Sequence, residues 1–251
     1  MSNEDRFVDP VESTTVVADQ QSLKRRRDAL RLLAMAGIAG ASLKPTYARE
    51  EAKEPEEDVS PAEDLMREHG LLNRILLIYE ESISRLSGGR EIDPAVLSAA
   101  AGIIRSFVED YHEKLEEGYL FPRFQKAGKL TDLVAVLKQQ HQAGRTLTDS
   151  TLRLATAAAI KDPGEKARLV QHLTAFVRMY RPHEAREDTV LFPAFKHIVS
   201  EKEYDSLGDD FEKKEHELFG EQGFETMVKK VAELEKRLGI YELAQFTPAL
   251  K

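Results

Sequence analysis

The sequence predicts an all-α protein: an up-down-up-down four-helix bundle with a C-terminal helical extension. The composition favours helix, because the 251 residues include only 14 glycines and 10 prolines. Four segments carry apolar residues at alternating steps of three and four, which is the spacing of one helix face. Short segments rich in Gly, Pro or Asp separate these four stripes, and short connections favour antiparallel neighbouring helices.

The first two helices have clear start signals. Ser60-Pro61 is expected to open the first, since proline is tolerated at the first helical position, and Ser87-Gly88-Gly89 is expected to end it. Asp93-Pro94 is expected to open the second. The predicted stripes are Leu65, His69, Leu72, Leu76, Tyr79, Ile83 and Leu86 in the first helix, and Ile104, Val108, His112, Leu115 and Tyr119 in the second.

The third and fourth helices follow in the same way. Thr131 is expected to cap the third helix, and Lys161-Asp162-Pro163-Gly164 is expected to form a turn before the fourth. The stripes are Val134, Leu137, His141, Gly144 and Thr148, then Leu169, Leu173, Phe176, Tyr180, His183, Glu187 and Val190. Further helical pattern after residue 200 predicts that the chain continues as an extension of the same domain.

An internal repeat carries the candidate chemistry. Residues 112–124 and 183–195 both read H-E-x-x-E-x-x-x-L-F-P-x-F, and seven identities in thirteen positions rarely arise by chance. Another histidine precedes each copy at nearly the same distance: His69 lies 43 residues before the first copy, and His141 lies 42 residues before the second. The core is therefore predicted to be one helix hairpin used twice.

Helix geometry predicts that the four histidines share one level of the bundle. Two residues of an antiparallel hairpin meet at one height when they are equidistant from the turn. The midpoints between successive histidines fall at 90.5, 126.5 and 162, all inside predicted turns. Positions four apart lie on one helix face, so Glu116 should lie beside His112 and Glu187 beside His183.

Such a layer is typical of a metal centre. The chain has no cysteine, which excludes disulfides, thiolate ligands and a thiol nucleophile and leaves nitrogen and oxygen ligands. Two buried carboxylates without a cation would be costly. Four imidazoles and two carboxylates therefore suit two divalent metal ions bridged by carboxylate. Mixed nitrogen and oxygen ligation favours iron, with manganese or zinc as weaker options.

These residues resemble the hemerythrin-like (HHE cation-binding) family. Its pattern H…HxxxE…H…HxxxE is met over roughly residues 60–200 by the candidate metal ligands His69, His112, Glu116, His141, His183 and Glu187. The resemblance implies a four-helix bundle that holds two bridged non-haem iron ions, which bind or react with O2, peroxide or nitric oxide.

Two positions depart from the oxygen-carrying members of that family. These members have H-x-x-x-H on the third helix, whereas Arg145 stands four residues after His141. The departure implies fewer nitrogen ligands on one iron, which favours reaction with peroxide or another oxidant over reversible oxygenation. They also use H-x-x-x-x-D on the last helix, and Asp188 has that spacing from His183. The repeat favours Glu187 as the ligand, with Asp188 as the alternative.

Other polar residues are interpreted as structural. His172 lies about 16 Å along the helix from His183 at 1.5 Å per residue, which is too far for the same site. His197 is expected at the surface, and His216 either at the surface or folded back as a spare ligand. The glutamates beside the motif are expected at the edge of the site or in solvent: Glu113, Glu117 and Glu184.

The N-terminal segment resembles a twin-arginine export signal. Arg26-Arg27, one spacer residue and Ala-Leu-Arg precede a Gly/Ala-rich apolar run, although Ala29 stands where phenylalanine is common. Cleavage is expected after Ala41 or Ala48, and the location is expected to be periplasmic or otherwise exported through the twin-arginine route. The predicted organisation is a leader over 1–48, an acidic linker over 49–59 and a domain over 60–251 with its core at 60–200 and C-terminal helices at 201–251.

The predicted function is to bind or react with O2, peroxide or nitric oxide at a two-iron centre, with or without enzymatic turnover. The alternative is an iron-binding storage, donor or sensor module without turnover. A net charge of −8 provides no basic field for nucleic acid. The apolar run after Arg31 is too short for a stable membrane span. The sequence indicates no particular redox partner.

Overall fold

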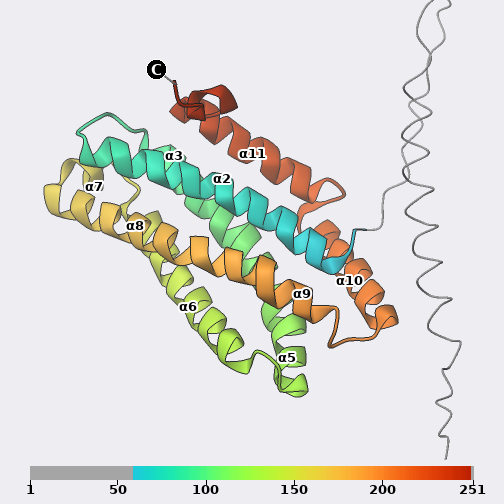
Figure 1. Cartoon of the computed structure of the whole chain (residues 1–251). Coiled ribbons are helices and arrows are strands. Elements are labelled where there is room, and N and C mark those ends of the chain that lie inside the picture. The colour runs from blue at the N-terminus through green and yellow to red at the C-terminus, as the bar shows by residue number, and fades with distance from the viewer. Residues whose placement is uncertain (1–58, 250–251) are drawn as a thin grey trace, which may run out of the picture. The chain divides into compact units, whose positions relative to one another are not determined.

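A computed structural model of the protein describes residues 59–249. The predicted leader and nearly all of the predicted linker therefore lie outside the described residues. Between residues 59 and 249 all regular structure is helical, as the sequence predicts (Figure 1). No helix in this range combines the length and the hydropathy that crossing a membrane requires.

The first helix, α2, spans Pro61–Ser87 and begins and ends as predicted. Ser60 and Glu63 form a capping box, in which each side chain accepts a hydrogen bond from the other residue's backbone N–H. Gly88 follows the helix, and Gly89 takes a positive φ of 68° that a residue with a side chain would adopt only under strain.

The second helix runs without a break from Pro94 to Ala127, and Asp93 caps it by accepting from the Ala95 N–H. It passes through five segments: α3 (Pro94–Ile103), the π-helix η1 (Ile104–His112), α4 (Glu113–Leu115), the π-helix η2 (Glu116–Leu120) and α5 (Phe121–Ala127). Gly128 ends it with a φ of 62°, in the left-handed conformation typical of a helix C-terminus.

The third helix, α6, spans Thr131–Leu154, and the predicted cap is wrong by one residue. Leu130 takes the N-cap position with a φ of 50°, and Thr131 is the first helical residue. The turn predicted at 161–164 is also shorter in the structure, where only Asp162 lies between two helices. A short helix, α7 (Ala157–Lys161), fills most of the connection, and Asp162 caps the next helix by accepting from the Glu165 N–H.

The fourth helix continues from α8 (Pro163–Arg186) through the π-helix η3 (Glu187–Leu191) into α9 (Phe192–Phe195). The two copies of the repeat thus have the same backbone: a π segment that begins at the glutamate and ends before Phe-Pro. In a regular α-helix a proline ring clashes with the carbonyl four residues earlier. The i→i−5 bonds Phe121 N–H to Glu116 O and Phe192 N–H to Glu187 O widen the helix just before Pro122 and Pro193.

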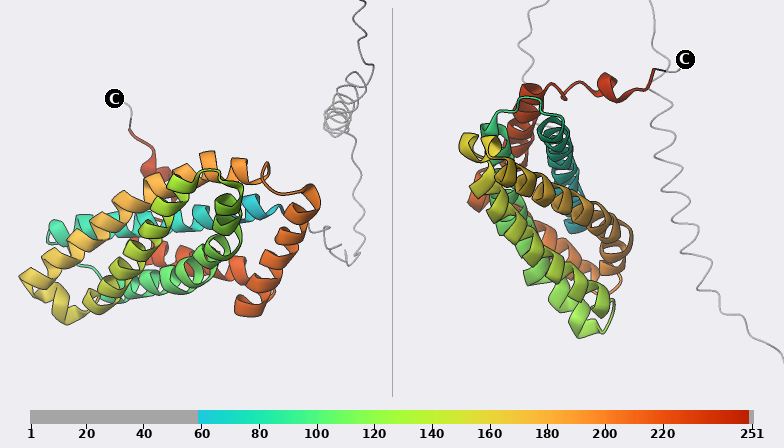
Figure 2. Two further views of the ribbon diagram at one scale, coloured as in Figure 1. Left: turned by 90° about the horizontal axis from the view of Figure 1, so that it is seen from below. Right: turned by 90° about the vertical axis from the view of Figure 1, so that its left-hand side faces the viewer.

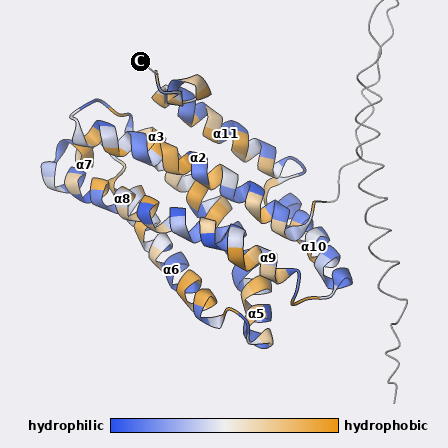
Figure 3. Ribbon diagram, in the orientation of Figure 1, coloured by the Kyte–Doolittle hydropathy of each residue, from blue (hydrophilic) through white to orange (hydrophobic). Residues whose placement is uncertain are grey.

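The four long helices form an antiparallel bundle, in which α2 packs against α3 and α8, and α6 packs against α3 and α8 (Figures 1 and 2). Hydrophobic and hydrophilic residues alternate along each helix (Figure 3). Every residue of the four predicted stripes is buried except Ile83, Tyr119 and Val190, which are partly buried. The helical period read from the sequence therefore identifies the inner faces of the bundle.

The C-terminal extension consists of α10 (Glu201–Phe219), α11 (Gly223–Leu238) and the 3₁₀ turn η4 (Leu243–Phe246). Helix α11 packs against α2 and α3, and α10 packs against α2 and α11 (Figure 1). Phe211 of α10 and Val231 of α11 are completely buried, so both helices add to the bundle core.

Candidate metal centre

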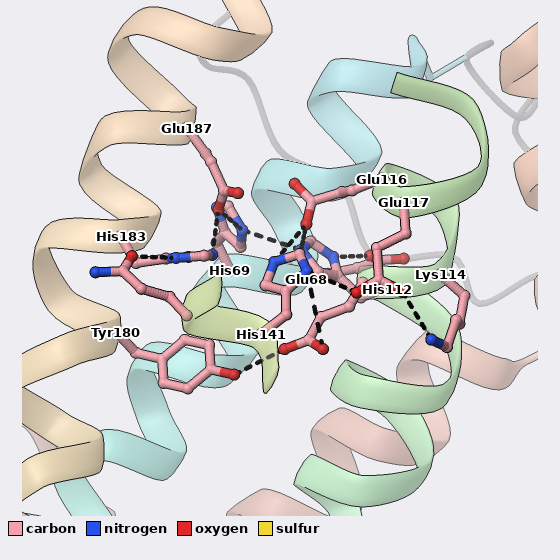
Figure 4. A network of polar contacts seen from close by, with 12 residues as sticks. Glu68, His69, His112, Lys114, Glu116, Glu117, His141, Tyr180, His183 and Glu187 are labelled. Carbon is pink, nitrogen blue, oxygen red and sulfur yellow. Dashed lines mark hydrogen bonds and ion pairs between the residues drawn. The ribbon is translucent and has the colours of Figure 1, made fainter. Parts of the chain in front are cut away.

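The six candidate ligands converge inside the bundle from all four long helices (Figure 4). None of the six is more than 4% exposed, and both carboxylates are completely buried. His69 lies on α2, and His141 lies in the middle of α6. His112 and His183 lie at the ends of η1 and α8, and Glu116 and Glu187 begin the π segments η2 and η3.

The histidines form two pairs whose ring nitrogens face each other. His69 Nε2 lies 3.1 Å from His112 Nε2, with a glutamate oxygen of Glu116 close to both. The rings of His141 and His183 lie 5.1 Å apart, with Glu187 close to both. In each group, one potential ligand atom per residue lies within 4.8 Å of the others. Each half of the layer thus offers two imidazoles and one carboxylate to a common point.

Each carboxylate also reaches across to the other half. Glu116 Oε2 lies 3.3 Å from His141 Nε2 and 3.8 Å from His112 Nε2. Glu187 Oε2 lies 3.1 Å from His183 Nε2 and 3.5 Å from His69 Nε2. Both glutamates therefore lie between the two histidine pairs, where a carboxylate can bridge two metal ions.

The outer nitrogen of every histidine has a hydrogen-bond acceptor. The four contacts are His69 Nδ1 to Asp188 Oδ1 at 2.7 Å, His112 Nδ1 to Glu68 Oε2 at 2.5 Å, His141 Nδ1 to Glu117 Oε1 at 3.2 Å, and His183 Nδ1 to Gln140 Oε1 at 2.8 Å. An Nδ1–H that donates outward leaves the Nε2 lone pair free to point inward. Metal-binding histidines are held in this way.

The metal-free histidines divide into protonated and neutral partners. Burial acts to lower the pKa of His69, but the hydrogen bond to Asp188 and the nearby Glu187 outweigh it and raise the pKa to about 9. Burial also acts to lower the pKa of His141, but the hydrogen bonds to Glu116 and Glu117 outweigh it and raise the pKa to about 10. Burial lowers the pKa of His112 and of His183 to about 3. Each pair of the metal-free protein therefore carries one positive charge at neutral pH, on His69 and on His141.

The donor set fits two divalent cations. Both oxygens of Glu116, both oxygens of Glu187 and His141 Nε2 are buried and make no hydrogen bond within residues 59–249. Buried polar atoms are normally paired, and two buried carboxylates without partners are costly. Metal ions would satisfy these atoms. The ligand types are imidazole and carboxylate, which suit iron, manganese or zinc.

Arg145 replaces the second histidine of the third helix and serves a different purpose. Its Nη2 lies 2.7 Å from Glu113 Oε2 and 2.8 Å from Glu117 Oε1. Burial raises the pKa of Glu113 to about 7, although His141, the Tyr180 hydroxyl and Arg145 act against it. Arg145 thus balances the charge of two glutamates around His141 rather than adding a ligand.

Tyr180 fits beside the centre because residue 144 is a glycine. Its hydroxyl donates to Glu113 Oε1 at 2.7 Å, and a Cβ on residue 144 would lie 2.0 Å from the same hydroxyl. We expect Gly144→Ala to displace Tyr180 and to destabilise the protein by about 1–3 kcal/mol. Urea denaturation measures the change. Gly102→Ala is the matched control, because its added Cβ meets nothing within 4 Å and should stabilise the helix. Equal stability of the two variants would contradict the role given to Gly144.

The repeated Leu-Phe-Pro-x-Phe segments close one side of the layer. The Phe192 ring stacks on His69 with centroids 5.4 Å apart, and the Phe121 ring stacks on His141 at 5.5 Å. The ring centroids of Phe124 and Phe195 lie 5.9 Å apart. Because the π segments precede these phenylalanines in both copies, the same backbone feature positions a glutamate and the aromatic ring that covers a histidine.

The remaining predicted residues lie outside the cluster. Asp188 is on the outer side of His69, hydrogen-bonded to its Nδ1, whereas Glu187 points into the layer. His172 is half-buried, and His197 and His216 are exposed. Of the neighbouring glutamates of the motif, Glu113 and Glu117 lie at the edge of the site beside His141, as expected. Glu113 and Glu184 are 1% and 2% exposed, and Glu184 accepts a hydrogen bond from Asn73.

Sequence reasoning did not find Glu68 and Gln140, the acceptors for His112 and His183. A signal was available, since each directly precedes a histidine of the pattern, His69 or His141. On a helix, adjacent residues point in different directions, so each acceptor serves a histidine of a neighbouring helix and not the one it precedes.

The outer acceptors should control metal affinity. We expect Asp188→Ala to weaken metal binding by about 10–100-fold, because His69 loses the partner that fixes its ring and tautomer. Asp188→Asn, which keeps an acceptor oxygen, should have a smaller effect. Competition with a chromophoric chelator measures the affinity. Asp205→Ala, at an exposed position of α10, is the control. An unchanged affinity in Asp188→Ala would contradict this role.

The sequence matches one family of known proteins. The sequence matches the Hemerythrin HHE cation binding domain over residues 60–195 and again, overlapping, over residues 132–251. An uncharacterized protein of Mycobacterium tuberculosis (strain H37Rv) is 49% identical over 219 residues, which is 87% of this chain and 86% of the relative. Uncharacterized proteins of the CDC 1551 strain and of Mycobacterium bovis match to the same extent. No solved structure matches the chain.

Proposed function

The chain belongs to the hemerythrin HHE cation-binding family, and we propose that it holds two non-haem iron ions and binds or reacts with O2, peroxide or nitric oxide there. One observation carries the proposal. Four buried histidines have their Nδ1 atoms hydrogen-bonded outward, and their Nε2 atoms face two buried carboxylates that make no hydrogen bond within residues 59–249. Iron in such a ligand set would supply the redox chemistry and the binding of a diatomic molecule or peroxide.

The side chains have distinct roles in this proposal. His69 and His112 would hold one ion with Glu116, and His141 and His183 would hold the other with Glu187. Both carboxylates also lie near a histidine of the other group. The outer acceptors fix the imidazole rings, and Phe121 and Phe192 cover two of the rings and limit access of water.

Reaction with an oxidant is favoured over reversible oxygen carriage by the residue at position 145. Arg145 forms ion pairs with Glu113 and Glu117 and supplies no imidazole, so the His141 side has one nitrogen ligand fewer than an H-x-x-x-H helix would give. Fewer protein ligands leave room for an exogenous one. Peroxide is the oxidant that we would test first.

Metal analysis together with the ultraviolet–visible spectrum tests the proposal, on the wild type and on Glu116→Ala. We expect about two irons per chain from the two ligand groups, with oxo-bridged charge-transfer bands that are lost in the variant. Addition of O2, peroxide and nitric oxide to the reduced protein then identifies the ligand. Catalytic turnover of peroxide with an added reductant distinguishes an enzyme from a storage or sensor module. Iron content unaffected by Glu116→Ala would overturn the two-iron proposal.

We also propose that residues 1–48 direct export through the twin-arginine route, supported by Arg26-Arg27 and the Gly/Ala-rich run that follows. Fusion of residues 1–48 to a reporter that is active only after export tests this. We expect export of the wild-type fusion and its loss on replacement of both arginines by lysine, because the route depends on the arginine pair. Arg25→Lys, next to the pair, is the control. Export that persists without both arginines would contradict the proposal.

A further inference from the structure

A second cluster of oxygen ligands lies next to the metal centre, where α10 meets α2. Asp64 and Glu68 of α2 and Glu215 of α10 each present a carboxylate oxygen to a common point, and the three oxygens lie within 4.8 Å of one another. Oxygen ligands of a hard divalent cation lie about 2.3–2.6 Å from the ion. Two oxygens bound to one such ion are therefore no more than about 5 Å apart, and the three oxygens of this cluster satisfy that limit.

The deepest member of the cluster has an oxygen without a partner. Glu68 is 1% exposed, and its Oε2 accepts from His112 Nδ1 at 2.5 Å. Its Oε1 is buried and makes no hydrogen bond within residues 59–249. Glu215 is also buried, at 8% exposure, and its Oε1 accepts from the Phe224 N–H at 2.7 Å. A buried carboxylate oxygen without a hydrogen bond is costly, and a bound cation would remove that cost.

The charge of this cluster is only partly balanced. In the described part of the chain, its one ion pair is Arg67 with Asp64 at 3.8 Å, because the neutral His112 contacts Glu68 as a hydrogen-bond donor. Burial raises the pKa of Asp64 to about 7, and the charge of Glu68 raises it further. The Tyr111 hydroxyl, beside Glu68, offers one more oxygen. Three acids and a phenol packed together with a single arginine beside them favour a divalent cation.

The cluster connects the surface with the metal centre. On its outer side, Glu212 lies close enough to influence Asp64 electrostatically. Glu212 lines an open depression of about 530 Å³ on α10, together with Asp209, Lys213, His216 and Glu217. On its inner side, Glu68 hydrogen-bonds His112 (Figure 4). Acidic side chains thus continue from the exposed face of α10 to the ring of a candidate ligand.

We propose that Asp64, Glu68 and Glu215 bind a divalent metal ion and that this site loads the His/Glu centre with Fe2+. The loading role rests on the proposed function, whereas the binding of a hard cation does not. Acidic residues lining the approach raise the local cation concentration, which accelerates capture. Glu68, which belongs to the carboxylate cluster and contacts His112, is the link between the two sites.

Terbium luminescence tests the carboxylate site by itself. Tb3+ prefers carboxylate to imidazole, and a nearby tyrosine sensitises its emission. The chain has no tryptophan, and Tyr111 lies at the cluster. We expect emission from the metal-free full-length protein that is lost in Asp64→Asn/Glu215→Gln and retained in Asp205→Asn, an exposed position of the same helix outside the depression. The Gln at 215 keeps an acceptor for the Phe224 N–H, and Asp64→Asn alone provides a second, milder variant.

A variant of the other centre separates the two proposals. Emission should persist in Glu187→Gln, which alters the His/Glu centre and leaves the carboxylate cluster intact. Unchanged emission in the double variant, or its loss in Glu187→Gln, would overturn the proposed site.

Loading kinetics test the role. We expect anaerobic Fe2+ uptake in stopped-flow experiments to be at least about tenfold slower in the double variant, with the final iron content unchanged. Uptake at the wild-type rate would overturn the loading role. If the wild type takes up no Fe2+, the proposed function fails, and the terbium result still decides whether the carboxylate site exists.

Discussion

Replacement of Glu187 by Gln is expected to abolish metal binding at the His/Glu centre and, at the same time, to stabilise the metal-free protein. Burial raises the pKa of Glu187 despite the opposing charges of His69 and His141, so the ionised carboxylate is less stable in the folded chain than in water. A neutral amide of the same shape removes that penalty, which is worth about 1.4 kcal/mol for each unit of pKa shift. The same change removes a bridging ligand.

Melting temperatures with chelator and with added metal measure both effects. Metal at 1,000 times its Kd stabilises a protein that binds it only when folded by about 4 kcal/mol. We therefore expect the melting temperature to be highest for the metal-loaded wild type, lower for Glu187→Gln, and lowest for the metal-free wild type. Added metal should raise the melting temperature of Glu187→Gln much less than that of the wild type. Glu109→Gln is the control, since Glu109 is also completely buried but pairs with Arg105 away from the centre. A Glu187→Gln protein that gains as much stability from metal as the wild type does would contradict the assignment.

The metal-free protein should lose stability as the pH rises from 7 to 9. Burial raises the pKa of Glu113 to about 7 and of Glu184 to about 8, and Asp188 and Glu187 hold the pKa of His69 at about 9 against burial. The folded chain therefore binds more protons than the unfolded chain in this range, and the free energy of unfolding falls with rising pH for as long as the folded chain retains them. Each retained proton contributes a slope of about 1.4 kcal/mol per pH unit.

Urea denaturation between pH 7 and 9, with chelator and with metal, measures this slope. The low pKa values of His112 and His183 affect stability only below about 6.5, the ordinary histidine value, so they do not enter the window. Bound metal replaces protons on the ligands, and its stabilising effect should therefore grow with pH. Glu184→Gln should give a shallower slope near pH 8. A metal-free protein that becomes more stable between pH 7 and 9 would contradict the protonation pattern.

Much of the fold and the convergence of the candidate ligands could be predicted from the sequence. The periodicity of the stripes identified the inner faces, and equal distances from the turns placed His69, His112, His141 and His183 at one level, where the structure also has them. These arguments succeed because regular helices convert spacing along the chain into position. The same rule placed Glu116 and Glu187 beside their histidines.

Features that depend on packing between helices could not be read from spacing. The places of Glu68 and Gln140 directly before a histidine make them candidates, but spacing along the chain does not show that they contact His112 and His183, because each pair lies on different helices. The π segments were also missed. Two of them, η2 and η3, lie just before Pro122 and Pro193, whereas no proline lies just after η1. The Thr131 cap failed because Leu130 adopts a left-handed backbone that its residue type does not favour.

The two copies of the repeat have equal ligands but unequal surroundings. The acceptors behind His69 and His112 are the carboxylates of Asp188 and Glu68. Those behind His141 and His183 are Glu117, which Arg145 neutralises, and the uncharged Gln140. The duplicated hairpin has therefore diverged into a polarised centre. Two chemically identical ions would be inequivalent there, and the more highly charged ion should be favoured on the His69 side.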